Sequence, residues 1–214
     1  MLISHSLRFI FFHVPKTAGI SIREALKEYS QEPEKFKINR PPKIKNNKPN
    51  PMYEIWQAYL LHAKAKDAKK ELSQDIYNSY YKFAFVRNPW DFQVSMYIFL
   101  KNMKYKPICE ISTFEEYLDW VVKTKNPYPK GATKLQKEIL TDDDGNIIVD
   151  FIGRYENLQK DFDHVCNVLN ISATLPLLNN TVHKEYQSYY NDKTRKIVDD
   201  HFKADIQLFD YKFI

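Results

Sequence analysis

The segment RFIFFHVPKTAGIS, residues 8–21, decides the fold of this 214-residue chain. Residues 8–14 form a short apolar run rich in aromatic side chains, which predicts a buried strand. After Pro15 the apolar residues take the spacing of a helix, which we expect to run from about Ala18 to Tyr29. A strand, a tight turn and a helix in this order form the first part of a βα unit, so this segment predicts an α/β protein.

The same order of strand and helix returns twice further along the chain. Residues 82–87 predict a second buried strand, after which Asn88 suits an N-cap, Pro89 the first helical position and Asp91 the first turn. Residues 147–154 predict a third buried strand, followed by another helix. The apolar face of that helix consists of Leu158, Phe162, Val165, Cys166 and Leu169. This alternation predicts a three-layer α/β/α fold with a central, mainly parallel sheet.

Further helices are expected around the sheet. Their patterns fall at about residues 63–72, 113–124 and 192–208. Ser112 and Glu115 suit a capping box at the start of the second of these helices.

The connecting segments are less regular. Residues 30–52 are polar and rich in lysine and proline, which predicts a long surface loop that is either mobile or faces a substrate. Residues 53–61 fit a strand or a helix equally, and residues 141–146 form a turn around Asp-Asp-Asp-Gly. The length of the chain favours a single domain over residues 1–214.

Composition limits the possible functions. The chain is 43% hydrophobic and 15% aromatic, which excludes a mostly disordered protein. Its net charge of +5 is compatible with an anionic ligand but does not require nucleic acid, and no nucleic-acid partner is expected. Only four residues are glycine, so a position at which the backbone must lack a side chain is marked by a rare residue. The four are Gly19, Gly131, Gly145 and Gly153.

The cysteines and the apolar runs of the sequence bear on the cellular location of the protein. Cys109 and Cys166 have no spacing typical of a disulfide framework or a metal site, and Cys166 is expected in the core. The apolar run at residues 7–14 is too short to span a bilayer and lacks the features of a signal peptide. The sequence therefore predicts a cytoplasmic protein without a transmembrane segment.

The junction HVPKTAGIS, residues 13–21, has the chemistry of an anion site. A helix N-terminus exposes backbone N–H groups that attract phosphate or sulfate, and Gly19 lets a ligand approach the backbone. Lys16 adds a cation, and Thr17 and Ser21 add hydroxyl groups. The order differs from a Walker A loop, because Lys16 precedes the glycine and no earlier glycine exists. An ordinary capped βα turn is the alternative.

A second junction, FVRNPWDFQVSMY at residues 85–97, places Arg87 at the end of a predicted strand and Ser95 about two helical turns later. In parallel sheets the carboxyl ends of the strands form the ligand crevice. An arginine fork and a hydroxyl group suit one phosphate. A structural ion pair of Arg87 and packing of Ser95 are the alternative.

Together the two segments resemble the sulfotransferases, in particular the carbohydrate sulfotransferases called sulfotransferase family 2. The likeness rests first on PKTAG at residues 15–19 and RNPWD at residues 87–91. It continues through HAKAKDAKKEL at 62–72, DGNIIVDFIGRYENLQKDFDHVCNVL at 144–169 and NNTVHKEYQSYYNDKTRKIV at 179–198, and so covers most of the chain.

The resemblance implies a P-loop-like sulfotransferase fold and the donor 3′-phosphoadenosine 5′-phosphosulfate, with 3′-phosphoadenosine 5′-phosphate as product. The residues implied at the 5′ end of the donor are Lys16, Thr17, Ala18, Gly19, Ile20 and Ser21. Arg87 and Ser95 are implied at its 3′ phosphate. The family's usual TAGTS is TAGIS here, so Ile20 removes one hydroxyl group. Phe92 and Gln93 stand where members commonly carry an arginine.

Sulfuryl transfer needs a base for the acceptor hydroxyl and stabilisation of charge on the leaving phosphate. We expect Lys16 to stabilise that charge. We expect His62 to be the base, because imidazole titrates near neutral pH and the resemblance places a basic histidine in this segment. A histidine that caps or packs at a helix start is the alternative. His13 is the rival base, although its position favours a donor contact or packing.

The remaining expectations concern partners. By resemblance, Thr181 and Lys184 are weak candidates for a lid on the adenosine, with a solvated loop as the alternative. The acceptor is expected to be a hydroxyl group of a carbohydrate, in a glycan or glycolipid, and no metal is expected. The competing functions are a P-loop-type kinase that uses ATP and a non-catalytic module that binds polyanions.

Overall fold

The computed structural model describes residues 1–30, 44–45, 47–49, 62–124, 134–178 and 183–214. The chain divides into two compact units. The first consists of Met1–Val86 with Glu138–Leu177, and the second of Arg87–Lys137 with Leu178–Ile214.

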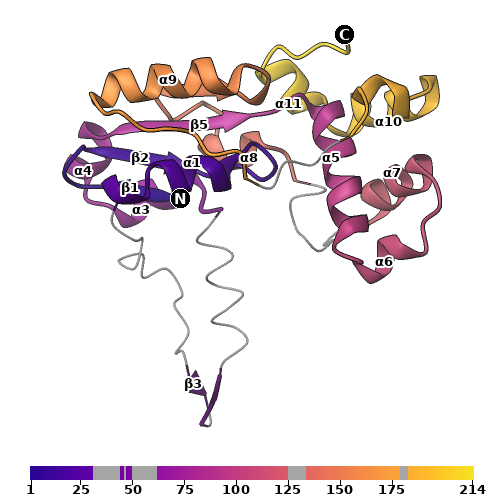
Figure 1. Ribbon diagram of the computed structural model, residues 1–214, viewed down its shortest axis with the longest axis horizontal. Coiled ribbons are helices and arrows are strands. Elements are labelled where there is room, and N and C mark those ends of the chain that lie inside the picture. Colours follow the sequence, from indigo (N-terminus) through magenta and orange to yellow (C-terminus); the bar gives the residue numbers. More distant parts are fainter. Residues whose placement is uncertain (31–43, 46, 50–61, 125–133, 179–182) are drawn as a thin grey trace. The chain divides into compact units, whose positions relative to one another are not determined.

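The first unit contains a four-stranded sheet in the order β1-β2-β5-β6 (Figure 1). β1 (Leu2–Ser4) pairs antiparallel with β2 (Phe9–Phe12). β5 (Tyr81–Val86) lies between β2 and β6 (Phe151–Arg154) and is parallel to both. The sheet is therefore mixed, with one antiparallel strand at its edge, as in many α/β folds.

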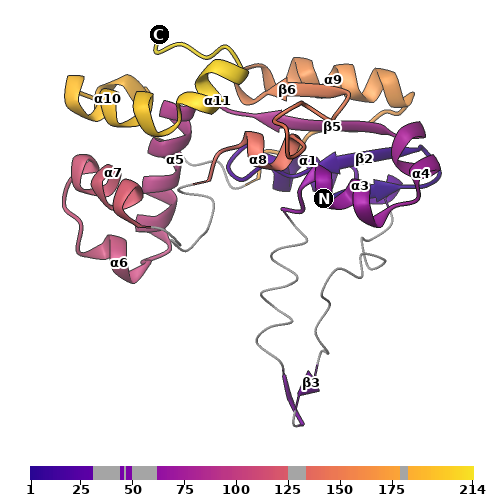
Figure 2. The same ribbon diagram turned by 180° about the vertical axis from the view of Figure 1, so that it is seen from behind.

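Helices lie on both faces of this sheet. α1 (Gly19–Ala25) lies in front of the sheet in Figure 1, whereas α3 (Ala65–Glu71) and α4 (Gln74–Ser79) lie in front of it in the view from behind (Figure 2). α9 (Leu158–Leu169) packs on the same face as α1, because both helices contribute to one apolar cluster. The cluster includes Phe9, Phe11, Phe83 and Phe85 from the strands, Ile22 and Leu26 from the first helical segment, and Phe162 and Val165 from α9.

The opposite face contains a buried lysine. Lys82 of β5 points away from the phenylalanine cluster because side chains alternate along a strand. Its Nζ donates to the backbone carbonyl groups of Tyr77 (3.1 Å) and Tyr80 (2.7 Å) and lies 2.8 Å from Asp150 Oδ2. These partners satisfy a charge that is otherwise costly to bury, and they attach the C-terminal part of α4 to the sheet.

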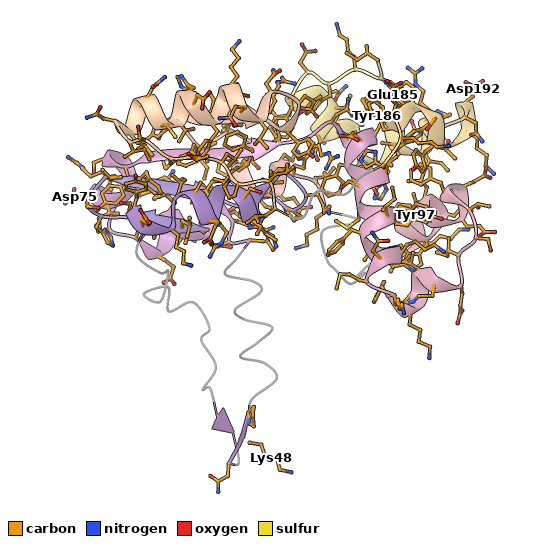
Figure 3. All side chains as sticks on the ribbon, in the orientation of Figure 1. Lys48, Asp75, Tyr97, Glu185, Tyr186 and Asp192 are labelled. Atoms are coloured by element: carbon orange, nitrogen blue, oxygen red, sulfur yellow. The ribbon has the colours of Figure 1, made fainter. Side chains whose placement is uncertain are left out.

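The second unit is helical where the structure describes it. α5 (Pro89–Asn102) contacts α7 (Phe114–Lys123) and α10 (Asp192–His201), and α11 (Lys203–Leu208) follows α10. Tyr117 of α7 is fully buried, and its hydroxyl donates to Gln93 Oε1 of α5 at 2.8 Å. Its ring centroid lies 5.1 Å from that of Tyr97, which is labelled in Figure 3. Aromatic packing around one buried hydrogen bond therefore joins α5 to α7.

Shorter elements complete the description. They are the 3₁₀ turns Lys27–Tyr29, Tyr155–Asn157 and Tyr186–Tyr189, the helices α6 (Lys106–Cys109) and α8 (Lys137–Leu140), and the antiparallel pair β3 (Ile44–Lys45) and β4 (Lys48–Pro49). β3 and β4 belong to the predicted surface loop at residues 30–52, most of which lies outside the described residues, as does the whole of residues 53–61.

Most predicted elements are confirmed near their predicted positions, including the N-cap. Asn88 Oδ1 accepts from the backbone N–H of Trp90 (3.0 Å) and of Asp91 (3.5 Å), and Pro89 opens α5. The α/β class is also confirmed. Cys166 is buried in the apolar cluster, as predicted.

Some boundaries differ from the predictions. The capping box of α7 uses Thr113 and Glu116, one residue later than predicted, because the Thr113 side chain accepts from the Glu116 N–H. The third strand covers only the last four residues of 147–154, and its side chains are largely half-buried, since it forms an edge of the sheet. The predicted helix 18–29 ends in a 3₁₀ turn, and the predicted helix 192–208 is broken at Phe202.

Candidate functional site

The loop between β2 and α1 has an unusual backbone. Lys16 (φ 61°) and Ala18 (φ 60°) both lie in the left-handed region, on either side of Thr17. Such conformations cost about 1–3 kcal/mol each for residues other than glycine, and they cluster at functional sites. The Thr17 hydroxyl donates to the carbonyl oxygen of Val14 at 2.8 Å, which closes the loop on itself. The buried side chain of Thr17 therefore helps to stabilise the strained conformation of the loop.

This backbone suits an anion. Turns that contain left-handed residues can point successive N–H groups into a concave surface that binds phosphate and similar groups. Lys16, which is half-buried, brings a positive charge to the same loop. Thr17 and Ser21 are buried, so the hydroxyl proton of Thr17 serves the loop rather than solvent. Ile20 is 48% exposed and places an apolar side chain at the start of α1.

Gly19 has a specific reason to be glycine. A Cβ added at residue 19 would lie 1.8 Å from Cδ2 and 2.1 Å from Nε2 of His13. Any other residue would therefore have to displace the buried His13 ring, which comes from the end of β2. The missing Cβ of Gly19 therefore leaves room for a neighbouring side chain. The predicted approach of a ligand to the Gly19 backbone stays a prediction.

His62 lies beside His13. Its Nδ1 is 2.8 Å from the carbonyl oxygen of His13, and the two ring centroids are 4.6 Å apart. A carbonyl oxygen only accepts hydrogen bonds, so Nδ1 of His62 is the protonated nitrogen. In the neutral ring, Nε2 is then the nitrogen that can accept a proton, as a general base requires. The structure thus brings His62 to the loop that carries Lys16.

His13 itself is unsuited to be the base. Burial lowers its pKa well below the usual 6.5, and the charge of His62 lowers it further. Its Nδ1 is buried and has no hydrogen-bond partner among the described residues. A neutral, enclosed ring of this kind packs against its neighbours, which is one of the two roles, a donor contact or packing, that the sequence favoured.

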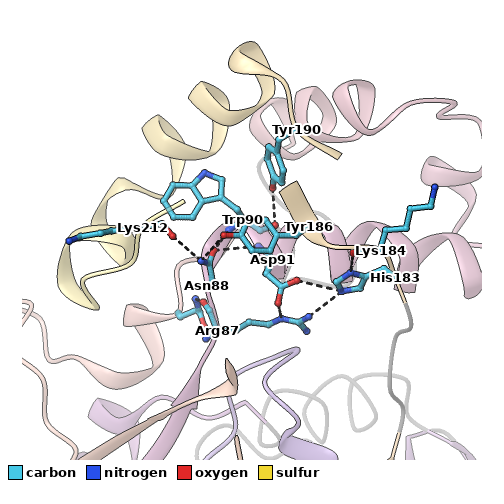
Figure 4. A network of polar contacts seen from close by, with 10 residues as sticks. Arg87, Asn88, Trp90, Asp91, His183, Lys184, Tyr186, Tyr190 and Lys212 are labelled. Carbon is cyan, nitrogen blue, oxygen red and sulfur yellow. Dashed lines mark hydrogen bonds and ion pairs between the residues drawn. The ribbon is translucent and has the colours of Figure 1, made fainter. Parts of the chain in front are cut away.

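Arg87 lies in the second unit, in a network of polar contacts (Figure 4). Its Nε donates to Asp91 Oδ2 at 2.7 Å, and its Nη2 lies 3.3 Å from Nε2 of His183. Gln136 exchanges two hydrogen bonds with the backbone of Arg87, at 2.9 Å and 2.7 Å. The structural ion pair that the sequence left open is therefore present, and a phosphate at Arg87 would have to compete with Asp91.

The other residues predicted at the 3′ phosphate and the lid are placed differently. Ser95 of α5 is fully buried, and its Oγ has no hydrogen-bond partner among the described residues. Lys184 is exposed, and its side chain extends away from Arg87 (Figure 4). Thr181 lies outside the described residues.

Sequence reasoning missed two participants in the second unit. His183 contacts Arg87, although the prediction named its neighbour Lys184. Nδ1 of His183 lies 2.7 Å from the carbonyl oxygen of Lys184, which fixes the proton on Nδ1 and leaves Nε2 to accept from Arg87. Asp91 was expected only as a first-turn residue of α5. Its spacing of four residues from Arg87 was the available signal for the ion pair.

Within the described ranges, no group of three or more His, Cys, Asp and Glu side chains is placed to hold a metal ion. No helix in the part of the chain that the structure describes is both long and apolar enough to cross a membrane.

An α/β unit whose strained loop carries a lysine and lies beside a histidine has groups that can bind an anion and accept a proton. Residues 1–212 match the sulfotransferase family, so the chain belongs to this family. A relative in Archaeoglobus fulgidus, described as an uncharacterized protein, is 29% identical over 115 residues, which are 53% of this chain and 87% of the relative. No solved structure was found to match the chain.

Proposed function

We propose that this chain transfers the sulfuryl group of 3′-phosphoadenosine 5′-phosphosulfate to a hydroxyl group of a carbohydrate acceptor, in a glycan or a glycolipid. Membership of the sulfotransferase family supports sulfuryl transfer in general. The observation that carries the proposal is the hydrogen bond from His62 Nδ1 to the His13 carbonyl, because it holds the ring that we propose as the base near the loop of Lys16. The same proposal includes a three-layer, P-loop-like fold that acts as one domain over residues 1–214.

The donor fits the first unit at its 5′ end. The turn at Lys16–Ala18, with its two left-handed residues, supplies a surface of N–H groups for the phosphosulfate, and Lys16 supplies the positive charge. Gly19, Ile20 and Ser21 follow at the start of α1 and are proposed at the same end of the donor.

For the 3′ phosphate we propose Arg87 and Ser95. The unpartnered Oγ of Ser95 supports this assignment, because a buried hydroxyl without a partner loses about 1–3 kcal/mol that a ligand can restore. A phosphate that binds Arg87 must compete with the ion pair between Arg87 and Asp91. Thr181 and Lys184 remain predictions for the adenosine.

The proposed roles of His62 and Lys16 follow from where the proton and the negative charge go during sulfuryl transfer. The acceptor oxygen forms a bond to sulfur while the bond from sulfur to the bridging oxygen of the donor breaks. Nε2 of His62 takes the proton of the acceptor hydroxyl, and Lys16 stabilises the negative charge that remains on the leaving 5′ phosphate. A sulfuryl group carries less charge than a terminal phosphate, so we expect transfer to continue in the presence of a chelator.

The decisive experiment incubates the full chain with sulfur-labelled donor and a panel of glycans, glycolipids and small alcohols. We expect label on a carbohydrate, and stabilisation of the fold by adenosine 3′,5′-bisphosphate. Transfer only to non-carbohydrate hydroxyls would contradict the acceptor class. Absence of transfer together with stabilisation by magnesium-ATP, but not by the bisphosphate, would favour a kinase instead.

Two variants test the roles of the residues. Lys16→Ala should lower turnover by roughly 10²–10³-fold, the scale for loss of a donor to a developing oxyanion. Lys27→Ala is the matched control, since Lys27 is exposed and lies in the 3₁₀ turn that follows α1. His62→Ala should lose most of the transfer, by roughly 10²–10⁴-fold, and still bind the bisphosphate. Near-normal turnover of Lys16→Ala, or equal loss of binding and transfer in His62→Ala, would refute the respective role.

A further inference from the structure

His13 makes two contacts that link the loop of Lys16 to His62. Its carbonyl oxygen receives the hydrogen bond from His62 Nδ1 at 2.8 Å, and its ring occupies the space beside Gly19 in which a Cβ would otherwise lie. The base and the loop therefore meet at one residue, although they are separated by more than forty positions in the sequence.

Packing, more than polar contact, holds the His13 ring. The ring lies 6.1 Å from that of Phe11 in a stacked arrangement and 4.6 Å from that of His62. Its Nδ1 has no hydrogen-bond partner among the described residues, so no polar contact at this atom fixes the orientation of the ring. A closely packed ring transmits a displacement on one side to its neighbour on the other, because protein interiors are dense.

We propose that His13 is a positioning residue for sulfuryl transfer, which sets the distance between the loop of Lys16 and His62, and that residue 19 is glycine because the His13 ring must pack there. The inference rests on the proposed function, since it assigns His13 to the reaction that His62 and Lys16 carry out. It extends that function, because His13 acts through His62 and the loop and touches neither the donor nor the acceptor.

A double-mutant cycle separates this proposal from a ligand-based reason for Gly19. In Gly19→Ala the new methyl group displaces the His13 ring, so kcat falls by up to about 10²-fold, the scale expected for a misplacement of roughly 1 Å. In His13→Ala the ring is absent, so a further Gly19→Ala substitution has almost no additional effect. The KM for the donor changes much less than kcat. If Gly19→Ala reduces kcat by the same factor in both backgrounds, the methyl group obstructs the donor and the proposal is overturned.

The conservative variant His13→Phe tests whether the ring or its nitrogens matter. It keeps an aromatic ring beside Gly19 and His62, so its kcat should lie well above that of His13→Ala. Equal loss in the two variants would show that a ring nitrogen is required and would overturn the packing role. Gly153→Ala is the matched control, because it also drives a methyl group into an aromatic ring of the first unit but should leave kcat unchanged.

The free energy of unfolding of the same four proteins of the cycle gives a readout that needs no substrate. Gly19→Ala should destabilise the wild type and have a much smaller effect in the His13→Ala background. If this coupling is found but no protein of the series transfers sulfate, the proposed function fails while the packing of His13 on Gly19 stands. If transfer is found without coupling in either stability or kcat, the function stands and the role of His13 is overturned.

Discussion

Replacing Asp91 by asparagine tests how much the buried ion pair between Arg87 and Asp91 contributes to the free energy of unfolding. The Nε–Oδ2 distance is 2.7 Å, and the side chains are only 5% (Arg87) and 14% (Asp91) exposed. Removal of one partner from a buried ion pair costs about 3–5 kcal/mol, because the other charge remains buried without compensation. The asparagine oxygen can still accept from Nε, so we expect a loss near the lower value, about 3 kcal/mol.

The chain provides a matched control in the same unit. Lys123 and Asp119 have the same four-residue spacing on a helix and lie 3.2 Å apart, but their side chains are 75% and 46% exposed. Asp119→Asn should therefore cost less than about 1 kcal/mol. The assay is urea unfolding of both variants and the wild type at neutral pH, with and without adenosine 3′,5′-bisphosphate. Equal losses in the two variants would refute the reasoning from burial.

The unfolding measurements with adenosine 3′,5′-bisphosphate test whether Arg87 belongs to the proposed donor site. If the 3′ phosphate binds at Arg87, the bisphosphate supplies the negative charge that Asp91→Asn removes. The ligand should then stabilise the variant by more than it stabilises the wild type. Equal stabilisation would place the phosphate away from Arg87.

Two further predictions concern the first unit. Gly153→Ala places a Cβ 2.5 Å from Cε1 of Phe85, so overpacking should lower the free energy of unfolding by about 1–3 kcal/mol in urea titrations, and an unchanged stability would contradict the close contact. Because burial and the charge of His62 hold the pKa of His13 below its usual 6.5, the unfolded chain binds a proton below this pH that the folded chain does not. The His13 contribution to stability is therefore complete above about pH 6.5 and falls by about 1.4 kcal/mol per pH unit below it. In His13→Phe, the difference in unfolding free energy between about pH 7.5 and about pH 5.5 should shrink by about this amount, and an unchanged difference would show that His13 titrates normally when folded.

Local signals predicted the elements that position the site. The apolar run before Pro15 predicted β2, and the sequence from Asn88 to Asp91 predicted the cap and first turn of α5. Each of these features depends on residues within a few positions of one another, so periodicity and capping preferences contain the necessary information. The errors at Ser112 and Phe202 are of one or a few residues, which is the scale at which neighbouring caps and breaks compete.

Contacts between distant segments could not be predicted in the same way. β1 is a short strand that pairs with β2, and His5 next to it bonds to Tyr80 through its Nδ1 at 2.7 Å, although 75 positions separate the two residues. The contact of His183 with Arg87 spans 96 positions in the chain. Such partners are chosen by tertiary packing, for which a single sequence carries no local signal.

The sequence by itself determined the α/β class, and it predicted an anion site at residues 13–21 and a histidine that acts as base. Each of these follows from residue types at short spacing. Only the tertiary structure decided why Gly19 is bare, which nitrogen of His62 is protonated and what neutralises Arg87. These properties depend on which atoms approach within about 3 Å of one another, and burial then determines their energetic weight.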